Sequence, residues 1–132
     1  MIPKFRAWHN ELGRMMSISD MWFNVDSLGE IGLNDAVMND YITVSPDEIE
    51  LMQSTGLKDK NGKEIFEGDI VDYKGREAVV KWHGSYASFI YRFVDGLKER
   101  VSEWDPLFLA CYHFEVIGNI YENPEFLEVK DE

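Results

Sequence analysis

Apolar residues in this chain alternate with polar ones in short runs, and most runs end at glycine or asparagine. The segments REAVVKWH (residues 76–83) and SFIYRF (88–93) show the pattern clearly. Alternation with a period of two is typical of strands that bury one face. Short runs at spacings of roughly ten residues predict a mostly β fold with very little helix, arranged as a small antiparallel barrel or curled sheet.

The stretch TGLKDKNGKEIFEGDIV, from Thr55 to Val71, contains the strongest turn signal. Asn-Gly between two extended segments predicts a hairpin turn at Asn61 and Gly62. Gly68 is predicted to be a turn or bulge residue, and Asp69 to accept hydrogen bonds from nearby backbone amides. A phosphate-binding loop is disfavoured, because such loops need several glycines before a helix. We expect antiparallel β structure from residue 57 to 121.

The N-terminal third gives weaker signals. KFRAW predicts a strand, followed by a hairpin turn between Asn10 and Gly13. Residues 20–37 contain glycines among apolar residues, which predicts an irregular segment with one short strand at 21–25. The capping-box pattern at 45–48 predicts a single turn leading into a strand, with a helix over residues 45–54 as the alternative.

Length and charge limit the functional classes. With 132 residues the chain is expected to form one domain. The formal net charge of −12 disfavours binding to nucleic acid or to an anionic membrane. Cys111 is the only cysteine, so an intrachain disulfide is impossible, as suits a reducing cytoplasm. No apolar run is long enough to span a membrane, and we expect a cytoplasmic protein.

No catalytic or metal-binding pattern stands out, so we expect no enzyme activity, no metal and no cofactor. Cys111 and His113 would share a face if they lay on a strand, but a buried thiol beside a surface imidazole is the simpler interpretation. No serine lies in a nucleophile-elbow pattern. Cys111 also lies in an apolar run, where cysteines are typically structural and unreactive.

Aromatic residues are concentrated between residues 82 and 93. This stretch resembles a platform on which the bases of single-stranded nucleic acid stack, and it consists of Trp82, Tyr86, Phe89, Tyr91 and Phe93 together with Lys81 and Arg92. Aromatic residues that alternate along strands belong more often to a core. The order of preference is therefore core, then protein contact, then nucleic acid.

The chain contains 4 Trp, 6 Tyr and 8 Phe, more than a small core readily encloses. We expect some of Trp8, Trp22, Phe23 and Trp104 to lie at the surface, and Trp104 is a candidate binding residue. Exposed aromatic residues and open sheet edges favour interfaces. The sequence therefore predicts a homo-oligomer, with a dimer as the commonest arrangement.

Three segments resemble the YopX family of phage and prophage proteins: KFRAW, LMQSTGLKDKNGKEIFEGDIV and GNIYENPEFL. The resemblance implies an SH3-like barrel portion over residues 56–122, with an N-terminal β extension over 1–55 and an acidic tail over 123–132. It implies no catalytic residues. The function expected is that of an accessory protein that binds a phage or host protein or its own copies. The alternatives are a nucleic-acid-binding SH3-like or KOW-like barrel and an acidic DNA mimic.

Overall fold

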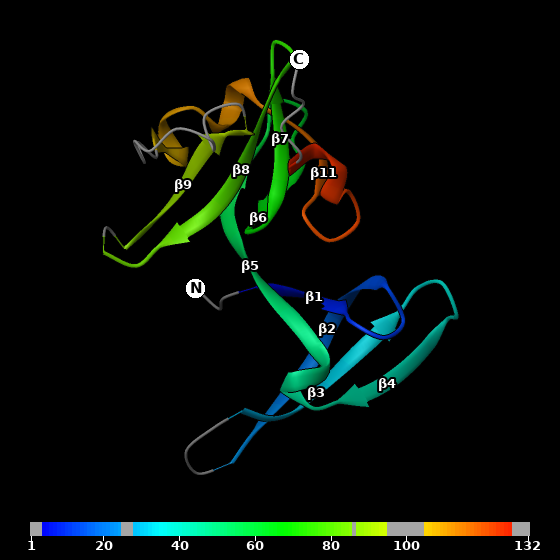
Figure 1. Ribbon diagram of the computed structural model, residues 1–132. Coiled ribbons are helices and arrows are strands. Elements are labelled where there is room, and N and C mark those ends of the chain that lie inside the picture. Colours follow the sequence, from blue (N-terminus) through cyan, green and yellow to red (C-terminus); the bar gives the residue numbers. More distant parts are fainter. Residues whose placement is uncertain (1–3, 25–27, 86, 95–104, 128–132) are drawn as a thin grey trace. The chain divides into compact units, whose positions relative to one another are not determined.

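The structure, a computed structural model, describes residues 4–24, 28–85, 87–94 and 105–127 (Figure 1). The chain divides into two compact units, Met1–Gln53 and Ser54–Glu132. Both are built almost entirely of antiparallel strands, which confirms the predicted mostly β class. None of the helices among the described residues is long and apolar enough to cross a membrane.

The first unit is a sheet in the order β4-β3-β2-β1-β5. Its core consists of alternate side chains from these strands: Ala7, Met16, Ile31, Leu33, Val44 and Ile49. The strands are β1 (Phe5–His9), β2 (Arg14–Phe23), β3 (Leu28–Asp35), β4 (Asp40–Val44) and β5 (Ile49–Lys58).

The predicted irregular segment over residues 20–37 is wrong, because β2 continues to Phe23 and β3 occupies residues 28–35. Glycine was interpreted as a breaker, but Gly32 lies inside β3. A side chain at this position would collide with the carboxylate of Asp20 and the hydroxyl of Tyr41. Gly32 therefore leaves room for these two side chains on the sheet and does not mark a turn.

The predicted single turn before β5 is confirmed. Pro46–Glu48 form the 3-10 helix η1, and the Glu48 carboxylate accepts a hydrogen bond from the Ser45 backbone N–H at 2.7 Å. The strand β5 begins directly at Ile49. Its first residues pair with β1, and residues 54 and 58 pair with β6 in the second unit.

The second unit contains a five-stranded sheet in the order β10-β9-β8-β7-β11 (Figure 1). Among the described strands neither edge of this sheet pairs with the other, so the SH3-like barrel is not confirmed. The strands of this unit are β6 (Glu64–Phe66), β7 (Asp69–Tyr73), β8 (Arg76–His83), β9 (Ser88–Phe93), β10 (Asp105–Pro106) and β11 (Glu115–Asn119). In the described part of this unit the 3-10 helices are η3 (Leu107–Leu109), η4 (Cys111–His113) and η5 (Pro124–Leu127), of which η5 lies within the predicted acidic tail.

The turn residues predicted between β5 and β7 are confirmed. Gly62 has a φ of +82° in the β5–β6 hairpin turn, where its N–H donates to the Asp59 carbonyl oxygen at 3.0 Å. Gly68 has a φ of +86° and its N–H donates to the carbonyl oxygen of Val80 in β8. The Asp69 carboxylate accepts the Phe66 N–H at 2.8 Å and is almost fully buried.

Asp59 links this hairpin to β11, an edge strand of the five-stranded sheet. One carboxylate oxygen accepts the N–H groups of Asn61 at 2.9 Å and Lys63 at 2.8 Å. The other accepts the N–H of Val116 in β11 at 2.9 Å. Burial raises the pKa of the Asp59 carboxyl, but the three backbone donors and the nearby charge of Lys63 outweigh it and hold the pKa below its ordinary value.

Replacing Gly62 by valine is expected to lower the free energy of unfolding by about 1–2 kcal/mol. No atom lies within 4 Å of the position of the added Cβ, so the cost arises from the positive φ alone. The matched control is Gly84→Val, because Gly84 has no strained φ. Urea unfolding followed by circular dichroism measures both. Equal midpoints for the two variants would contradict the turn geometry.

Candidate functional site

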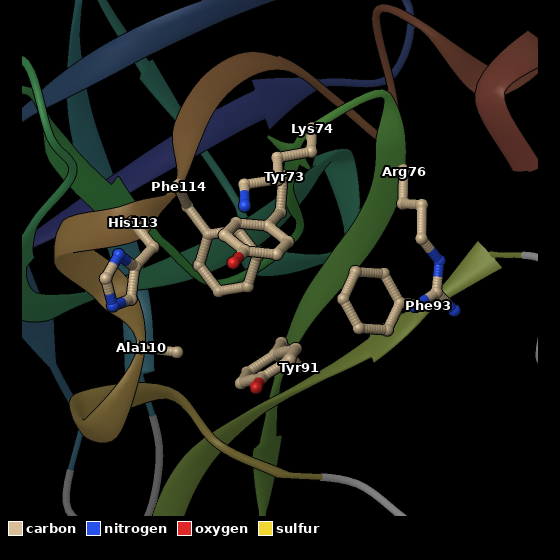
Figure 2. Close-up of a pocket in the computed structure, with 8 residues that line it drawn as sticks. All are labelled: Tyr73, Lys74, Arg76, Tyr91, Phe93, Ala110, His113 and Phe114. Atoms are coloured by element: carbon tan, nitrogen blue, oxygen red, sulfur yellow. The ribbon is translucent and has the colours of Figure 1, made fainter.

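The second unit contains a cavity of about 450 Å³ (Figure 2). Four aromatic rings, three basic side chains and one alanine line it. They are Tyr73, Lys74, Arg76, Tyr91, Phe93, Ala110, His113 and Phe114. A cavity of this size that is mostly apolar and has a few polar groups is typical of a binding site.

Strand alternation places half of the lining on one face of the sheet. Tyr73 in β7 is paired with Arg76 in β8, and Phe93 in β9 is paired with Ala78. Tyr91 lies two residues from Phe93 and therefore on the same face. The same face carries the core residues Val71, Ala78 and Val80 farther along the strands. The cavity therefore lies on the sheet face that also forms the core of this unit.

Phe114 is the floor of the cavity. Its side chain is 1% exposed, and its ring contacts those of Tyr91 at 4.8 Å and Tyr73 at 6.0 Å between centroids. Both contacts are edge-on, the geometry that aromatic pairs prefer. The segment from η3 to η4 crosses this face and contributes Ala110 and His113 to the wall (Figure 2).

The basic side chains are held against the rings. The guanidinium carbon of Arg76 lies 3.8 Å from the centroid of Phe93, and Lys74 Nζ lies 5.3 Å from that of Tyr73. Among the described residues that line the cavity, none carries a carboxylate. The alternation that turns Tyr73 and Arg76 inward places Asp72 and Glu77 on the opposite face. In a chain of net charge −12 the cavity is thus locally basic.

The structure separates the binding residues that the sequence suggested. Tyr91 lines the cavity, whereas Trp82 lies farther along the same face, 45% exposed, with its ring edge-on to Phe89 at 5.0 Å. Lys81 and Arg92 alternate onto the opposite face, away from these rings. Tyr86 and Trp104 lie outside the described residues.

The cysteine and histidine considered as a metal or catalytic pair lie in different environments. Cys111 is buried in the core, while His113 is exposed and its ring packs edge-on against Tyr73 at 6.0 Å. Within the described ranges, no group of three or more His, Cys, Asp or Glu residues is placed to hold a metal ion.

Comparison with known proteins identifies the family. The family model described as YopX protein matches residues 4–128. The chain belongs to the YopX family. No curated protein matches the chain.

Two solved structures resemble this YopX-family protein over nearly their whole length. Protein EF1440 from Enterococcus faecalis is 28% identical, with a TM-score of 0.63, and the match covers 97% of this chain and 99% of that one. YopX from Bacillus subtilis is 20% identical, with a TM-score of 0.53, and the match covers 95% and 98%. The second similarity shows the fold alone.

Sequence reasoning assigned five of the lining residues to no site: Tyr73, Lys74, Arg76, Ala110 and Phe114. It considered His113 only as a metal ligand beside Cys111. Of the five, Tyr73 and Arg76 flank Lys74-Gly75, the turn between β7 and β8. An aromatic residue and an arginine at equal distances from a tight hairpin turn face the same side of a sheet, and this signal was present in the sequence. Nothing in the sequence indicated that residues 110–114 cross that face.

Proposed function

We propose that this YopX-family chain is a non-enzymatic accessory protein of a phage or prophage that binds another protein. The pocket of the second unit receives an aromatic or aliphatic side chain of the partner, and carboxylates beside that side chain meet the basic rim. The observation that carries the proposal is the composition of the pocket: four rings and three basic side chains without a carboxylate. The family resemblance supports the phage origin.

The rings favour an apolar anchor. Tyr73, Tyr91 and Phe93 are partly buried around the fully buried Phe114, so their exposed faces surround a floor from which water is already excluded. A large side chain inserted here exchanges water for ring contacts, which is the usual basis of an interface hot spot. The cavity has room for one such side chain with part of its backbone.

The rim favours acidic neighbours on that anchor. Arg76 and Lys74 are fixed against rings, so they lose little side-chain entropy when they pair with a carboxylate. The net charge of −12 repels acidic partners at long range. An acidic segment is therefore attracted only at short range, by the basic rim of the pocket, and the rim selects the docking segment.

Single-stranded nucleic acid is the second candidate, because rings and an arginine are also suited to stacking a base. The net charge opposes a phosphate chain, and Lys81 and Arg92 alternate onto the opposite face from Trp82 and Tyr91. A nucleotide bound in the pocket would therefore have only Lys74 and Arg76 among the lining residues to neutralise its phosphate. Protein is preferred for this reason.

Fluorescence anisotropy with short labelled peptides tests the proposal. A peptide with one phenylalanine between acidic residues is expected to bind, and versions with alanine for phenylalanine or lysines for the acids are expected to bind at least tenfold more weakly. Arg76→Glu is expected to weaken binding of the acidic peptide at least tenfold. Lys81→Glu makes the same charge change on the opposite face of β8 and is expected to leave binding unchanged.

Equal binding of all three peptides, or an equal loss in both variants, would contradict recognition by the pocket. An oligothymidine strand serves as the competing probe. If it bound tightly and lost affinity in Arg76→Glu while no peptide bound, the nucleic-acid alternative would replace the protein one.

A further inference from the structure

We infer that the segment received by this pocket comes from a second copy of the same chain. The segment is the free end of the β2–β3 hairpin, which we call the arm and define as residues 20–23 and 28–30. Its two exposed aromatic residues, Trp22 and Phe23, are the anchors. This inference rests on the proposed function, because it names the partner of the same pocket.

The arm extends beyond the rest of its sheet. β1 pairs with β2 only over residues 14–17, and β4 pairs with β3 only over residues 31–35. Among the described strands, residues 20–23 and 28–30 therefore pair only with each other. Only Met21 and Leu28 of this ribbon pack against the core of the first unit. A two-stranded ribbon is marginally stable in water, and contact with another surface stabilises it.

The aromatic residues of the arm face solvent. Trp22 is 47% exposed and Phe23 is 71% exposed, whereas Met21 and Leu28 turn toward the core of the first unit. The β2–β3 register shifts between Trp22 and Phe23, and large aromatic side chains exposed on adjacent residues are typical of an interface. Phe23 is the most exposed of the aromatic residues in the described part of the chain.

The charges of the arm and the pocket are complementary. Glu30 is exposed and directly opposite Trp22 on the paired strand, and Asp20 lies two residues before it. The described lining residues of the pocket include Lys74, Arg76 and His113 and no carboxylate. The arm thus has the composition that the pocket selects, an aromatic anchor with acidic neighbours. No segment outside this chain is needed to supply it.

Each copy carries one arm and one pocket, so two copies that exchange arms form two identical contacts and a closed dimer. Removing the arm from one copy and the pocket charge from another leaves one intact contact when the two are mixed. This property distinguishes arm exchange from a dimer formed by any other surface.

Sedimentation velocity of the full chain at tens of micromolar tests the inference. Wild type is expected to form a dimer, and Phe23→Asp and Arg76→Glu are each expected to weaken dimerisation at least tenfold. An equimolar mixture of these two variants is expected to regain dimer above the level of either alone. Val37→Asp is the matched control, because Val37 is also 71% exposed in the first unit but lies outside the arm.

A monomeric wild type would overturn the inference, and so would a dimer that persists in both variants or a mixture that regains nothing. Binding of the acidic phenylalanine peptide to a monomeric wild type, weakened by Arg76→Glu, would keep the proposed function while excluding the second copy as the partner. Absence of peptide binding together with a monomeric wild type would overturn both.

Discussion

Replacing Asp59 by alanine is expected to lower the free energy of unfolding by about 3 kcal/mol or more, because hydrogen bonds to a charged group contribute roughly 1.5–3 kcal/mol each. The carboxylate is 5% exposed and accepts three backbone N–H groups, from Asn61, Lys63 and Val116. The substitution leaves these donors without their acceptor and releases the hairpin from β11. Urea unfolding at neutral pH measures the loss, with Glu11→Ala in an exposed turn as the control.

The same carboxylate makes stability depend on pH. Because the folded pKa of Asp59 lies below its unfolded value of about 3.9, its contribution is complete above that value and is lost as pH falls through the folded pKa. The difference in unfolding free energy between wild type and Asp59→Asn is therefore expected to shrink below about pH 4. A difference that stays constant from pH 7 to pH 3 would contradict a buried, ionised Asp59.

Phe114→Ala is expected to cost about 3–5 kcal/mol, the range measured when a fully buried phenylalanine is truncated. Phe114 is 1% exposed and contacts the rings of Tyr73, Tyr91 and Phe93. Its loss opens the floor of the pocket as well as the core. Phe108→Ala is the control, because it removes the same phenyl ring from a side chain that is 59% exposed. This substitution is expected to cost less than about 1 kcal/mol. Similar unfolding midpoints for both variants would contradict the packing around Phe114.

The sequence was most informative where a local rule decides the structure. Asn61-Gly62 forms a turn because Gly62 accepts a positive φ, and Asp69 accepts an N–H three residues before it, as short acidic side chains do at turns. Ser45 and Glu48 form the predicted turn before β5 for the same local reason. These features depend on neighbours in the chain and on nothing distant.

The sequence was least informative where distant residues decide the structure. Gly32 was interpreted as a breaker. The glycine instead leaves room for the side chains of Asp20 and Tyr41 on neighbouring strands, and the local sequence does not show these neighbours. The burial of Asp59 depends on the N–H of Val116, 57 residues away. The pocket combines Tyr73, Tyr91 and Phe114 from separate elements, and alternation predicts which way a side chain faces but not which segment covers it.

The central claim is that the pocket of the second unit is the binding site for an acidic aromatic segment. The most direct test is a titration of ¹⁵N-labelled protein with the acidic phenylalanine peptide, followed by two-dimensional NMR. We predict that the largest shifts fall on the amides of Tyr73, Arg76, Tyr91 and His113, and that they are absent in Arg76→Glu. Shifts centred on the opposite face of the sheet, at Lys81 and Arg92, or no shifts at saturating peptide, would contradict the claim.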